Sequence, residues 1–551
     1  MKEPFMFSRR VSLIAALSLC LPLATSRVQA QSSQQSTTAL PNAPSPAAPP
    51  QTPATSAARN TPSATDNPEK PPQTYNFHAQ YTLTGMADTS FSAKYTNPAY
   101  LVYGTGSSLP TQGQARETES ADVYFGYRLL PNTEFHVDAL FWQGYGLNNT
   151  YGVANFPDGE AFKVGVRYPH FAVARFFLRT TINLDGEAKE SVEDDLLTLR
   201  GKQDTNRLTL TIGRMSVKDI FDNNQYSNDP RGQFMNWALM ANAAYDYPAD
   251  ALGFTTGIAI EYNRPTWTLR YGWFQMSKYR NSFTAEGLYL TLPTADNAGD
   301  GKIFHNWGMV TELEHRHTLN AHPGAIRLLT FDNHANMGSY KAAVALANDP
   351  ATLAIYGTPA AFLASADDVS GGIDDTHALR NTWGLGLNAD QEITKNLGAF
   401  TRIGWNSGQN ESFEFTDSNW TATFGTSIKG ERWHQPDDVI GAAFLTSGIS
   451  KSAQAYLAAG GIGILTGDGA LNYGAEKNIE IERKNGEADG ARASAEAIEQ
   501  AKAIASITAV LGPLYIQYLQ AENIKGANRV YIPLNAGPQL VLPVKEKGED
   551  K

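Results

Sequence analysis

The sequence predicts an all-β protein, a transmembrane antiparallel β-barrel of about 16 strands (16–18), with long external loops of which one folds into the lumen. Apolar and polar residues alternate in many short segments between Tyr75 and Val544. After residue 30, no segment has the roughly 18 consecutive apolar residues that a membrane-spanning helix needs. The chain is also rich in glycine and aromatic residues, with 47 Gly, 9 Trp, 24 Tyr and 25 Phe against 18% charged residues.

Residues 1–30 have the form of a secretory signal peptide. Lys2, Arg9 and Arg10 form a positively charged start, an apolar stretch follows over 11–24, and Ala30 ends a small-residue cleavage site. We expect cleavage after Ala30. The single cysteine of the chain falls inside this segment, so the mature protein is expected to form no disulfide and to have no thiolate metal site.

Four further segments follow the signal peptide. Residues 31–73 are rich in Pro, Ala, Ser, Thr and Gln and are predicted to be a disordered linker. Residues 74–544 are predicted to form the barrel. Within it, 484–505 is rich in Ala and Glu and is interpreted as a helical or disordered insertion. Residues 545–551 form a charged tail.

The alternation is clearest in four segments, which we predict to be strands: 134–139, 207–212, 267–273 and 421–428. In the first of them Phe135 lies on the apolar face, between charged residues on the other. Aromatic residues gather near the ends of several segments, as in the girdles that barrels form at the two membrane interfaces. The strands of a soluble β-sandwich show the same alternation. It is therefore the large number of alternating segments that favours a membrane barrel.

Connection lengths indicate a topology. Residues 129–132 form a tight turn, whereas 145–172 and 214–237 are long. If the first strand runs outward, the segment after the fifth strand is the third external loop, which we expect to fold inward and narrow the lumen. The length of 184–206 conflicts with this alternation of long and short connections, because that segment would lie on the periplasmic side.

Several stretches have distinctive sequences. Residues 219–237 read DIFDNNQYSNDPRGQFMNW, residues 431–441 read ERWHQPDDVIG, and residues 448–469 read GISKSAQAYLAAGGIGILTGDG. Together with 147–165 they resemble the carbohydrate-selective porin family of the OprB type, over most of 75–544. The most specific positions are Asp229, Pro230 and Arg231 in the first stretch and Pro436, Asp437 and Asp438 in the second. We interpret the first three as locking a loop, through an aspartate-capped turn and a clamp from Arg231 to the backbone, rather than contacting a sugar. We interpret Asp437 and Asp438 as turn and strand-start residues.

The resemblance implies an outer-membrane porin with a narrow, often Arg-lined eyelet, through which small hydrophilic solutes, sugars above all, diffuse passively into the periplasm. It implies small saccharides as solutes. It also implies contact with outer-membrane lipid and lipopolysaccharide, insertion by the barrel assembly machinery, and the homotrimer that many porins form. No cofactor is implied.

Charged residues on the polar faces of the predicted strands are the candidates for lining the pore. A charge on the lipid face would cost about 2–4 kcal/mol near the midplane, so these side chains should point into the lumen. An Arg fork can also reach two sugar hydroxyls at once. The candidates are Arg175, Arg179, Arg207, Arg270, Arg316, Arg402, Glu134, Asp138, Glu312 and Glu314.

Two other functions remain open at this stage, a barrel enzyme and a soluble secreted carbohydrate-binding β-protein. Neither a nucleophile elbow nor a phosphate-binding loop is present in the sequence. His315 and His317 could share a metal, but they face away from the nearby glutamates, and the paired acids Asp194–Asp195 and Asp374–Asp375 fall in loops without a fixed partner. We therefore expect no enzymatic activity and no metal site. The net charge of −11 argues against a nucleic-acid partner.

Overall fold

The computed structural model of the chain describes residues 71–91, 109, 112–150, 152–153, 156–160, 166–186, 188–250, 252–277, 305–364, 372–414, 416–463, 465–466, 529–532 and 540–543. The expected signal peptide, the insertion at 484–505 and the charged tail lie outside these residues, as does nearly all of the expected linker. None of the helices in this part of the chain has the length and hydropathy needed to cross a membrane.

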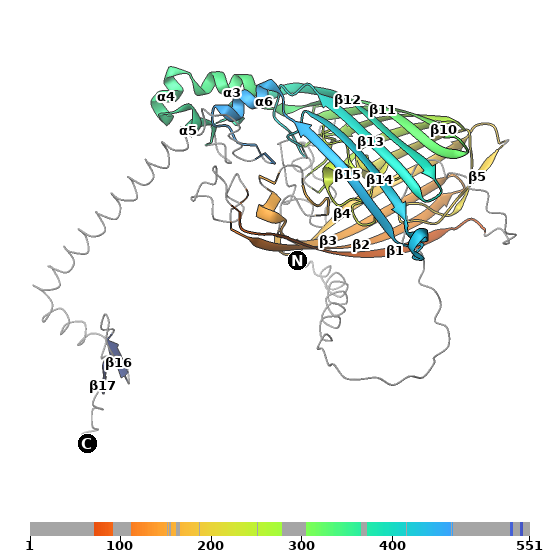
Figure 1. The fold of residues 1–551 in the computed structure, drawn as a ribbon, viewed down its shortest axis with the longest axis horizontal. Coiled ribbons are helices and arrows are strands. Elements are labelled where there is room, and N and C mark those ends of the chain that lie inside the picture. Colours follow the sequence, from red (N-terminus) through yellow and green to blue (C-terminus); the bar gives the residue numbers. More distant parts are fainter. Residues whose placement is uncertain are drawn as a thin grey trace, which may run out of the picture. The chain divides into compact units, whose positions relative to one another are not determined.

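Thirteen strands form one sheet in which each strand pairs with its neighbours in chain order (Figure 1). All of these pairings are antiparallel. The strands are β1 (Tyr75–Asp88), β2 (Gln114–Leu130), β3 (Thr133–Gly144), β4 (Val166–Asn183), β7 (Arg207–Met215), β8 (Thr255–Asn263), β9 (Trp267–Gln275), β10 (Trp307–Leu319), β11 (His322–Met337), β12 (Ala378–Thr394), β13 (Leu397–Asn406), β14 (Trp420–Lys429) and β15 (Val439–Gly448). The four segments singled out for their alternation lie in β3, β7, β9 and β14, so that prediction is confirmed.

Two smaller hairpins and several short helices complete the described structure. The hairpins are β5 (Lys189–Val192) with β6 (Gly201–Asp204), and β16 (Arg529–Ile532) with β17 (Leu540–Pro543). The helices are α2 (Trp237–Met240), α3 (Tyr340–Ala347), α4 (Pro350–Tyr356), α5 (Pro359–Leu363) and α6 (Lys451–Ala458), with short 3₁₀ turns that include η3 (Val217–Asp219) and η6 (Gly430–Trp433). The expected count of about 16 strands covers the range up to Val544, and most of 467–544 lies outside the described residues.

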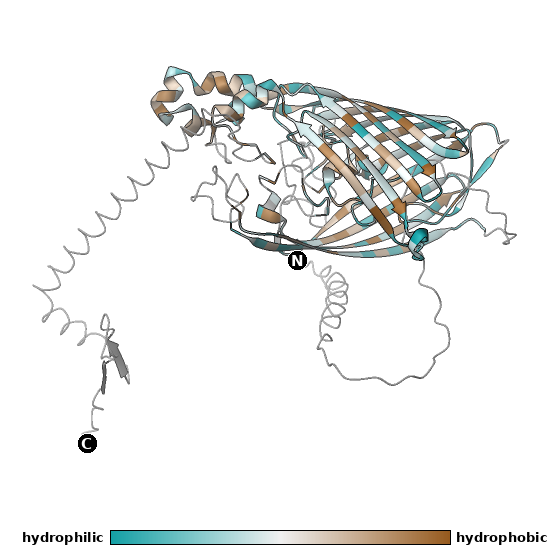
Figure 2. Ribbon diagram, viewed as in Figure 1, coloured by the Kyte–Doolittle hydropathy of each residue, from teal (hydrophilic) through white to brown (hydrophobic). Residues whose placement is uncertain are grey.

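The two faces of the main sheet differ as a barrel wall requires. Along β11 exposed and buried residues alternate: Ile326 and Leu328 are exposed, whereas Arg327 and Leu329 are buried. Apolar residues recur along the strands in this way throughout the sheet (Figure 2). Because an exposed row of large apolar side chains is stable only against lipid, and the buried face is polar and charged, the sheet is the wall of a transmembrane β-barrel.

The connections alternate between short and long along the chain. At one end the strands are joined by 131–132, 264–266, 320–321, 395–396 and 430–438, and at the other by 89–113, 145–165, 216–254, 276–306, 338–377 and 407–419. Residues 184–206 are the exception, a long connection at the end with short turns. Since bacterial barrels carry short turns on the periplasmic side and long loops outside, the long end is external.

The outward face allows a direct test of the barrel register. Leu328 lies near the middle of β11 and is 55% exposed, so Leu328→Arg is expected to lower the free energy of unfolding from lipid vesicles by about 2–4 kcal/mol. Leu319 is also exposed but ends β10, so Leu319→Arg should cost only about 0–1 kcal/mol. Equal losses for the two variants in a denaturant titration would contradict this register.

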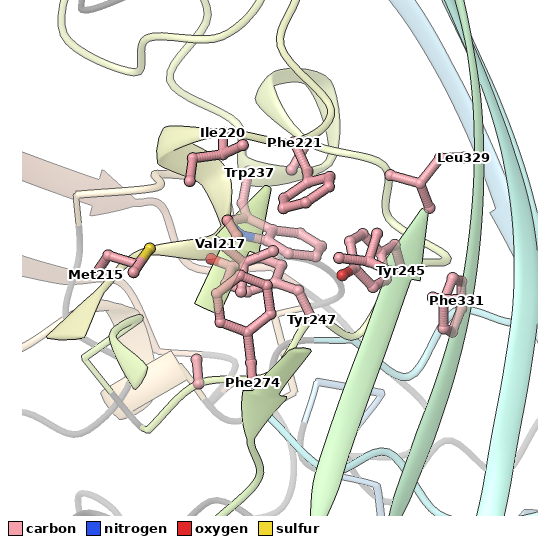
Figure 3. Packing of buried hydrophobic residues seen from close by; sticks show 14 of the residues in the cluster. Met215, Val217, Ile220, Phe221, Trp237, Tyr245, Tyr247, Phe274, Leu329 and Phe331 are labelled. Atoms are coloured by element: carbon pink, nitrogen blue, oxygen red, sulfur yellow. The ribbon is translucent and has the colours of Figure 1, made fainter. Parts of the chain in front are cut away.

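The loop between β7 and β8, residues 216–254, packs inside the barrel. It follows the fifth strand of the main sheet, so the expected inward fold of the third external loop is confirmed. Its apolar residues form a core with inward side chains of the wall, in which Tyr245 contacts Phe331 of β11 and Phe221 contacts Phe274 of β9 (Figure 3). The core joins the loop to β8, β9, β10 and β11, and it also includes Tyr124 of β2 and Phe177 of β4.

Candidate functional site

Asp222 anchors the inward loop to the barrel wall. Its Oδ1 accepts a hydrogen bond from Arg402 Nε at 3.0 Å and one from Asn388 Nδ2 at 2.7 Å, and its backbone N–H donates to Glu312 Oε2 at 2.7 Å. Its backbone φ is +55°, a left-handed conformation that a non-glycine residue adopts only when its surroundings hold it there. The loop is therefore held by three different strands, β10, β12 and β13, at one residue.

Lys218 completes this anchor from within the loop. Its ammonium group lies 3.2 Å from Asp222 Oδ2 and donates to the Asp222 carbonyl at 2.8 Å. Burial raises the pKa of Asp222, but Arg402 and Lys218 outweigh burial and lower it to about 2. Burial lowers the pKa of Lys218 to about 8, against the opposing effect of Asp222. The carboxylate is thus ionised at any physiological pH.

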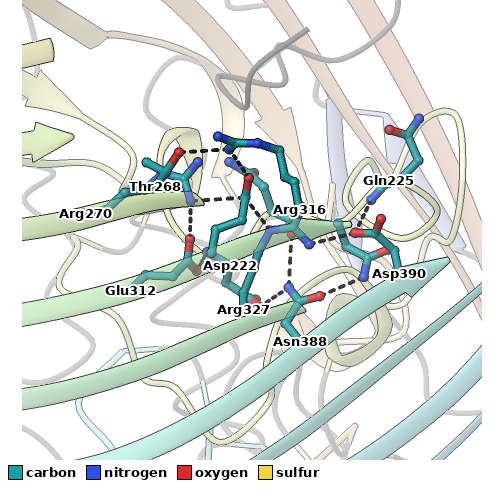
Figure 4. Close-up of polar contacts among 12 residues, drawn as sticks. Asp222, Gln225, Thr268, Arg270, Glu312, Arg316, Arg327, Asn388 and Asp390 are labelled. Atoms are coloured by element: carbon teal, nitrogen blue, oxygen red, sulfur yellow. Dashed lines mark hydrogen bonds and ion pairs between the residues drawn. The ribbon is translucent and has the colours of Figure 1, made fainter. Parts of the chain in front are cut away.

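A ladder of buried ion pairs continues along the wall beside this anchor (Figure 4). Arg270 donates to Glu261 at 3.0 Å, to Glu312 at 2.7 Å and to Glu314 at 3.2 Å. Arg327 bridges Glu314 and Asp390 at 2.8 and 2.6 Å. Because every one of these side chains is almost fully buried, the charges face inward and neutralise each other beneath the loop.

A second set of contacts links the barrel wall to the long connection 184–206, at the end of the barrel that carries the short turns. Arg179 donates to the Leu197 carbonyl at 2.8 Å, and Arg207 pairs with Glu190 at 2.7 Å. Leu197 is buried in the same core as the inward loop. The part of this connection around Leu197 and Leu199 therefore folds back into the barrel, whereas residues 184–186 are exposed.

A cavity of about 250 Å³ remains on the opposite side of the inward loop, against β2, β3 and β4. Its wall includes Asp122, Tyr124 and Arg175 from these strands, and its other side is formed by residues of 216–254 and by Leu196 and Leu197. This volume is just below the roughly 300–1,000 Å³ of typical small-molecule sites, which suits a solute of monosaccharide size.

Arg175 is the cavity residue with the most extensive ion pairing. Its Nε and Nη2 donate to the two carboxylate oxygens of Asp219, both at 2.8 Å, and its Nη1 donates to Asp138 at 2.7 Å. The guanidinium group also lies 4.9 Å from the centre of the Phe254 ring. Arg175 therefore joins the wall to the start of the inward loop where both meet the cavity.

Nine of the ten predicted lining residues fall into three groups, and Glu134 stands apart from them. Arg175 lines the cavity and Asp138 lies directly behind it; Arg270, Arg316, Arg402, Glu312 and Glu314 belong to the ladder and anchor; and Arg179 and Arg207 bind 184–206. Glu134 pairs with Arg128 and His136 near the short-turn end of β3. The structure thus brings half of the candidates together under the loop and leaves one in the cavity wall.

The two family motifs lie in different parts of the barrel, the first inside it and the second at the end with short turns. In the inward loop, Asp229 accepts a hydrogen bond from the Arg231 backbone N–H at 3.0 Å, which is the aspartate-capped turn expected there. Pro230 and Arg231 also line the cavity, and Arg231 bonds to Thr82 of β1 and to Glu160. The expected clamp from Arg231 to the backbone is wrong, because the side chain reaches across the cavity wall instead.

Residues 436–438 form the turn that precedes β15. Trp433 donates to Asp438 Oδ2 at 3.1 Å, and the Asp438 carbonyl accepts from Gly430 at 2.9 Å. Pro436 and Asp437 lie exposed in the same turn. All three residues therefore occupy a connection at the short-turn end, away from the cavity-lining residues.

One group of metal-ligand type is present among the described residues: Asp374, His377 and Glu411. His377 Nε2 lies 2.6 Å from Glu411 and 3.4 Å from Asp374. Asp194 accepts hydrogen bonds from Asn76 and lies 3.2 Å from His78. The expectation that the acids at 194 and 374 lack a fixed partner is therefore wrong. Asp194 pairs with His78, which is distant in the sequence, and Asp374 lies beside His377, three residues later.

Five residues that shape the cavity and the anchor were not among the predicted site residues: Asp122, Glu160, Lys218, Asp219 and Asp222. Asp219 and Asp222 stand in the first family-like stretch, and Glu160 stands in 147–165. Asp122 shares the buried face of β2 with Ser120 and Tyr124, so alternation alone could have found it. These residues are distinguished by their contacts between the loop and the barrel wall, and no short-range sequence pattern predicts such contacts.

Comparison with known proteins gives one family. The model of the carbohydrate-selective porin, OprB family, matches residues 107–481, more than half of the chain. A search of curated proteins found no match.

Among solved structures, the chain is similar to OprB of Pseudomonas putida (14% identity, 70% of this chain and 78% of that one, TM-score 0.46). It is also similar to OccAB1 of Acinetobacter baumannii (12% identity, 67% and 80%, TM-score 0.31) and to OmpF of Salmonella typhi (8% identity, 68% and 97%, TM-score 0.26). The assignment to a family rests on the family model rather than on these likenesses.

The matched range contains the three stretches that carry the resemblance inferred from the sequence, the inward loop and the cavity-lining strands β2, β3 and β4. The chain therefore belongs to the carbohydrate-selective porin, OprB family, and is an outer-membrane porin for the diffusion of sugars, a channel rather than an enzyme.

Proposed function

We propose that sugars cross the barrel through the cavity between the inward loop and the wall of β2, β3 and β4, by passive diffusion without a chemical step. The observation that carries this proposal is the cavity between the loop and β2, β3 and β4. Asp222 and the ladder hold the loop on the side of β9–β13, while Arg175 and Arg231 tie it to β4 and β1 at the edge of this cavity. Arg175 at the edge of this space is the residue of the predicted set best placed to meet a solute.

The cavity chemistry supports passage rather than catalysis. Acyl or glycosyl transfer by a serine needs a base beside the nucleophile. Among the described residues that line the cavity, Ser120 and Ser216 are the hydroxyl nucleophiles of that kind, and no histidine lies there to activate them. A barrel enzyme is therefore the weaker proposal.

Liposome swelling tests the channel directly. Vesicles that contain the purified protein should swell in isotonic glucose or maltose faster than protein-free vesicles, and faster for the smaller sugar. In planar bilayers, the same sugars should reduce the ionic current as they occupy the passage. Vesicles that admit ions but exclude monosaccharides would contradict the proposal.

For assembly we propose the partners that the family resemblance implies. The exported chain is inserted by the barrel assembly machinery, its external loops contact lipopolysaccharide, and three copies associate. Exposed aromatic side chains on β1 and β2, among them Tyr75, Phe77 and Phe125, offer an apolar outer face for lipid or for a second copy. Native mass spectrometry in detergent should find a trimer. A monomer at all concentrations would overturn the proposed association of three copies.

A further inference from the structure

The cations of the cavity wall are already paired with acids. Arg175 is bound by Asp138 and Asp219, as described above, and Lys218 by Asp222. Arg231, the third cation of the wall, lies 2.9 Å from Glu160. A solute that enters this cavity therefore meets cations whose charge is already balanced.

Asp122 differs from the other charged residues of the wall. It lies in β2 and is 5% exposed, and its Oδ2 is buried with no hydrogen-bond partner among the described residues. No ion pair ties it to Arg175 or Arg231, although both cations are close enough to influence it. A buried carboxylate oxygen that faces a cavity without a donor is a site for a donor supplied by the solute.

Acids also outnumber bases around this point. Asp158 and Asp229 lie near Glu160 and Arg231, in addition to Asp122. Burial raises the pKa of Glu160 to about 7, and the three nearby aspartates act in the same direction against Arg231. The aspartates around Glu160 therefore outnumber the single nearby cation, Arg231, which indicates a negative potential in this part of the cavity.

We propose that the cavity is a subsite for cationic solutes, in which Asp122 accepts the ammonium group of an amine-bearing saccharide. An ammonium group has three N–H donors and a full positive charge, so it satisfies Asp122 better than a neutral hydroxyl does. The apolar residues Leu140, Phe156 and Leu252 of the same wall can face the C–H groups of a pyranose ring. This inference rests on the proposed function, since it concerns the same passage.

The test compares three sugars of similar size in liposome swelling: glucosamine, N-acetylglucosamine and glucuronate, which are cationic, neutral and anionic at neutral pH. The expected order of rates is glucosamine first and glucuronate last. Asp122→Asn should lower the ratio of glucosamine to N-acetylglucosamine about fivefold, the effect of losing one charge close to the solute in a water-like environment. Glu119→Gln is the matched control, because Glu119 stands on the opposite face of β2, and it should leave the ratio unchanged.

Ion selectivity gives a second readout on the unmodified protein. In a KCl gradient the reversal potential should indicate a preference for K⁺ at pH 8. This preference should decrease as the pH falls through about 7, because Glu160 gains a proton below its raised pKa and loses its charge. Glu160→Gln should remove most of this pH dependence. Because it uses the unmodified protein, this measurement tests the cation preference of the cavity even if Asp122→Asn fails to fold.

The outcomes separate this inference from the proposed function. If no sugar enters the vesicles, the passage itself is wrong. If all three sugars enter at equal rates, or if Asp122→Asn and Glu119→Gln behave alike, sugars pass but the cationic subsite is wrong. A preference for Cl⁻ at pH 8 would overturn the subsite as well.

Discussion

Asp222→Ala is expected to raise the single-channel conductance several-fold, because it detaches the inward loop from the wall. The substitution removes the carboxylate that binds Arg402, Asn388 and Lys218 together. Arg402 is fully buried, so it is left as an uncompensated charge, a change that costs about 3–5 kcal/mol in comparable buried pairs. Local release of the loop costs less than unfolding the barrel, and so the loop should move first.

Planar-bilayer recording and liposome swelling measure this effect together. Beyond the higher conductance, larger saccharides that the natural protein excludes should enter the vesicles, and the current block by small sugars should weaken. Asp332→Asn is the matched control: Asp332 contacts Asn381 on the exposed side of β11 and takes no part in the anchor. An Asp222→Ala channel with unchanged conductance and size limit would show that packing alone holds the loop.

Arg175→Ala is expected to have the next largest effect. It removes the guanidinium group that neutralises Asp138, which is buried, and Asp219, at the start of the inward loop. Two acids are then left at the cavity edge without their cation, so the channel should become wider there and favour cations more strongly. The reversal potential in a KCl gradient and the single-channel conductance should both shift.

Two further variants sharpen this prediction. Arg175→Lys keeps the charge but cannot make the paired bonds to both oxygens of Asp219, so it should restore selectivity better than conductance. Arg179→Ala removes a bond to the Leu197 carbonyl and should change both readouts less than Arg175→Ala does, because Arg179 does not line the cavity. Indistinguishable effects of Arg175→Ala and Arg179→Ala would place the constriction elsewhere.

The sequence by itself determined the strands and the direction in which their side chains point. Segments such as 134–139 and 207–212 alternate residue by residue, and a strand converts that local period directly into a lipid face and a lumen face. Counting connections identified the loop after the fifth strand as the third external loop, and its inward position was expected because porins commonly fold such a loop into the lumen. Arg175 and Arg402 were both expected on the inner face, because a charge is costly in lipid.

Only the tertiary structure decided which inner charges meet the cavity. Arg402 and Asp222 are 180 residues apart, and Glu312 lies 90 residues from Asp222, yet these three groups form one buried anchor. Arg175 and Arg402 are equivalent in local sequence terms, but one borders the cavity and the other lies beneath the loop. The physical reason is that ion pairing inside a barrel depends on which wall the loop touches, and no short-range pattern along the chain records that contact.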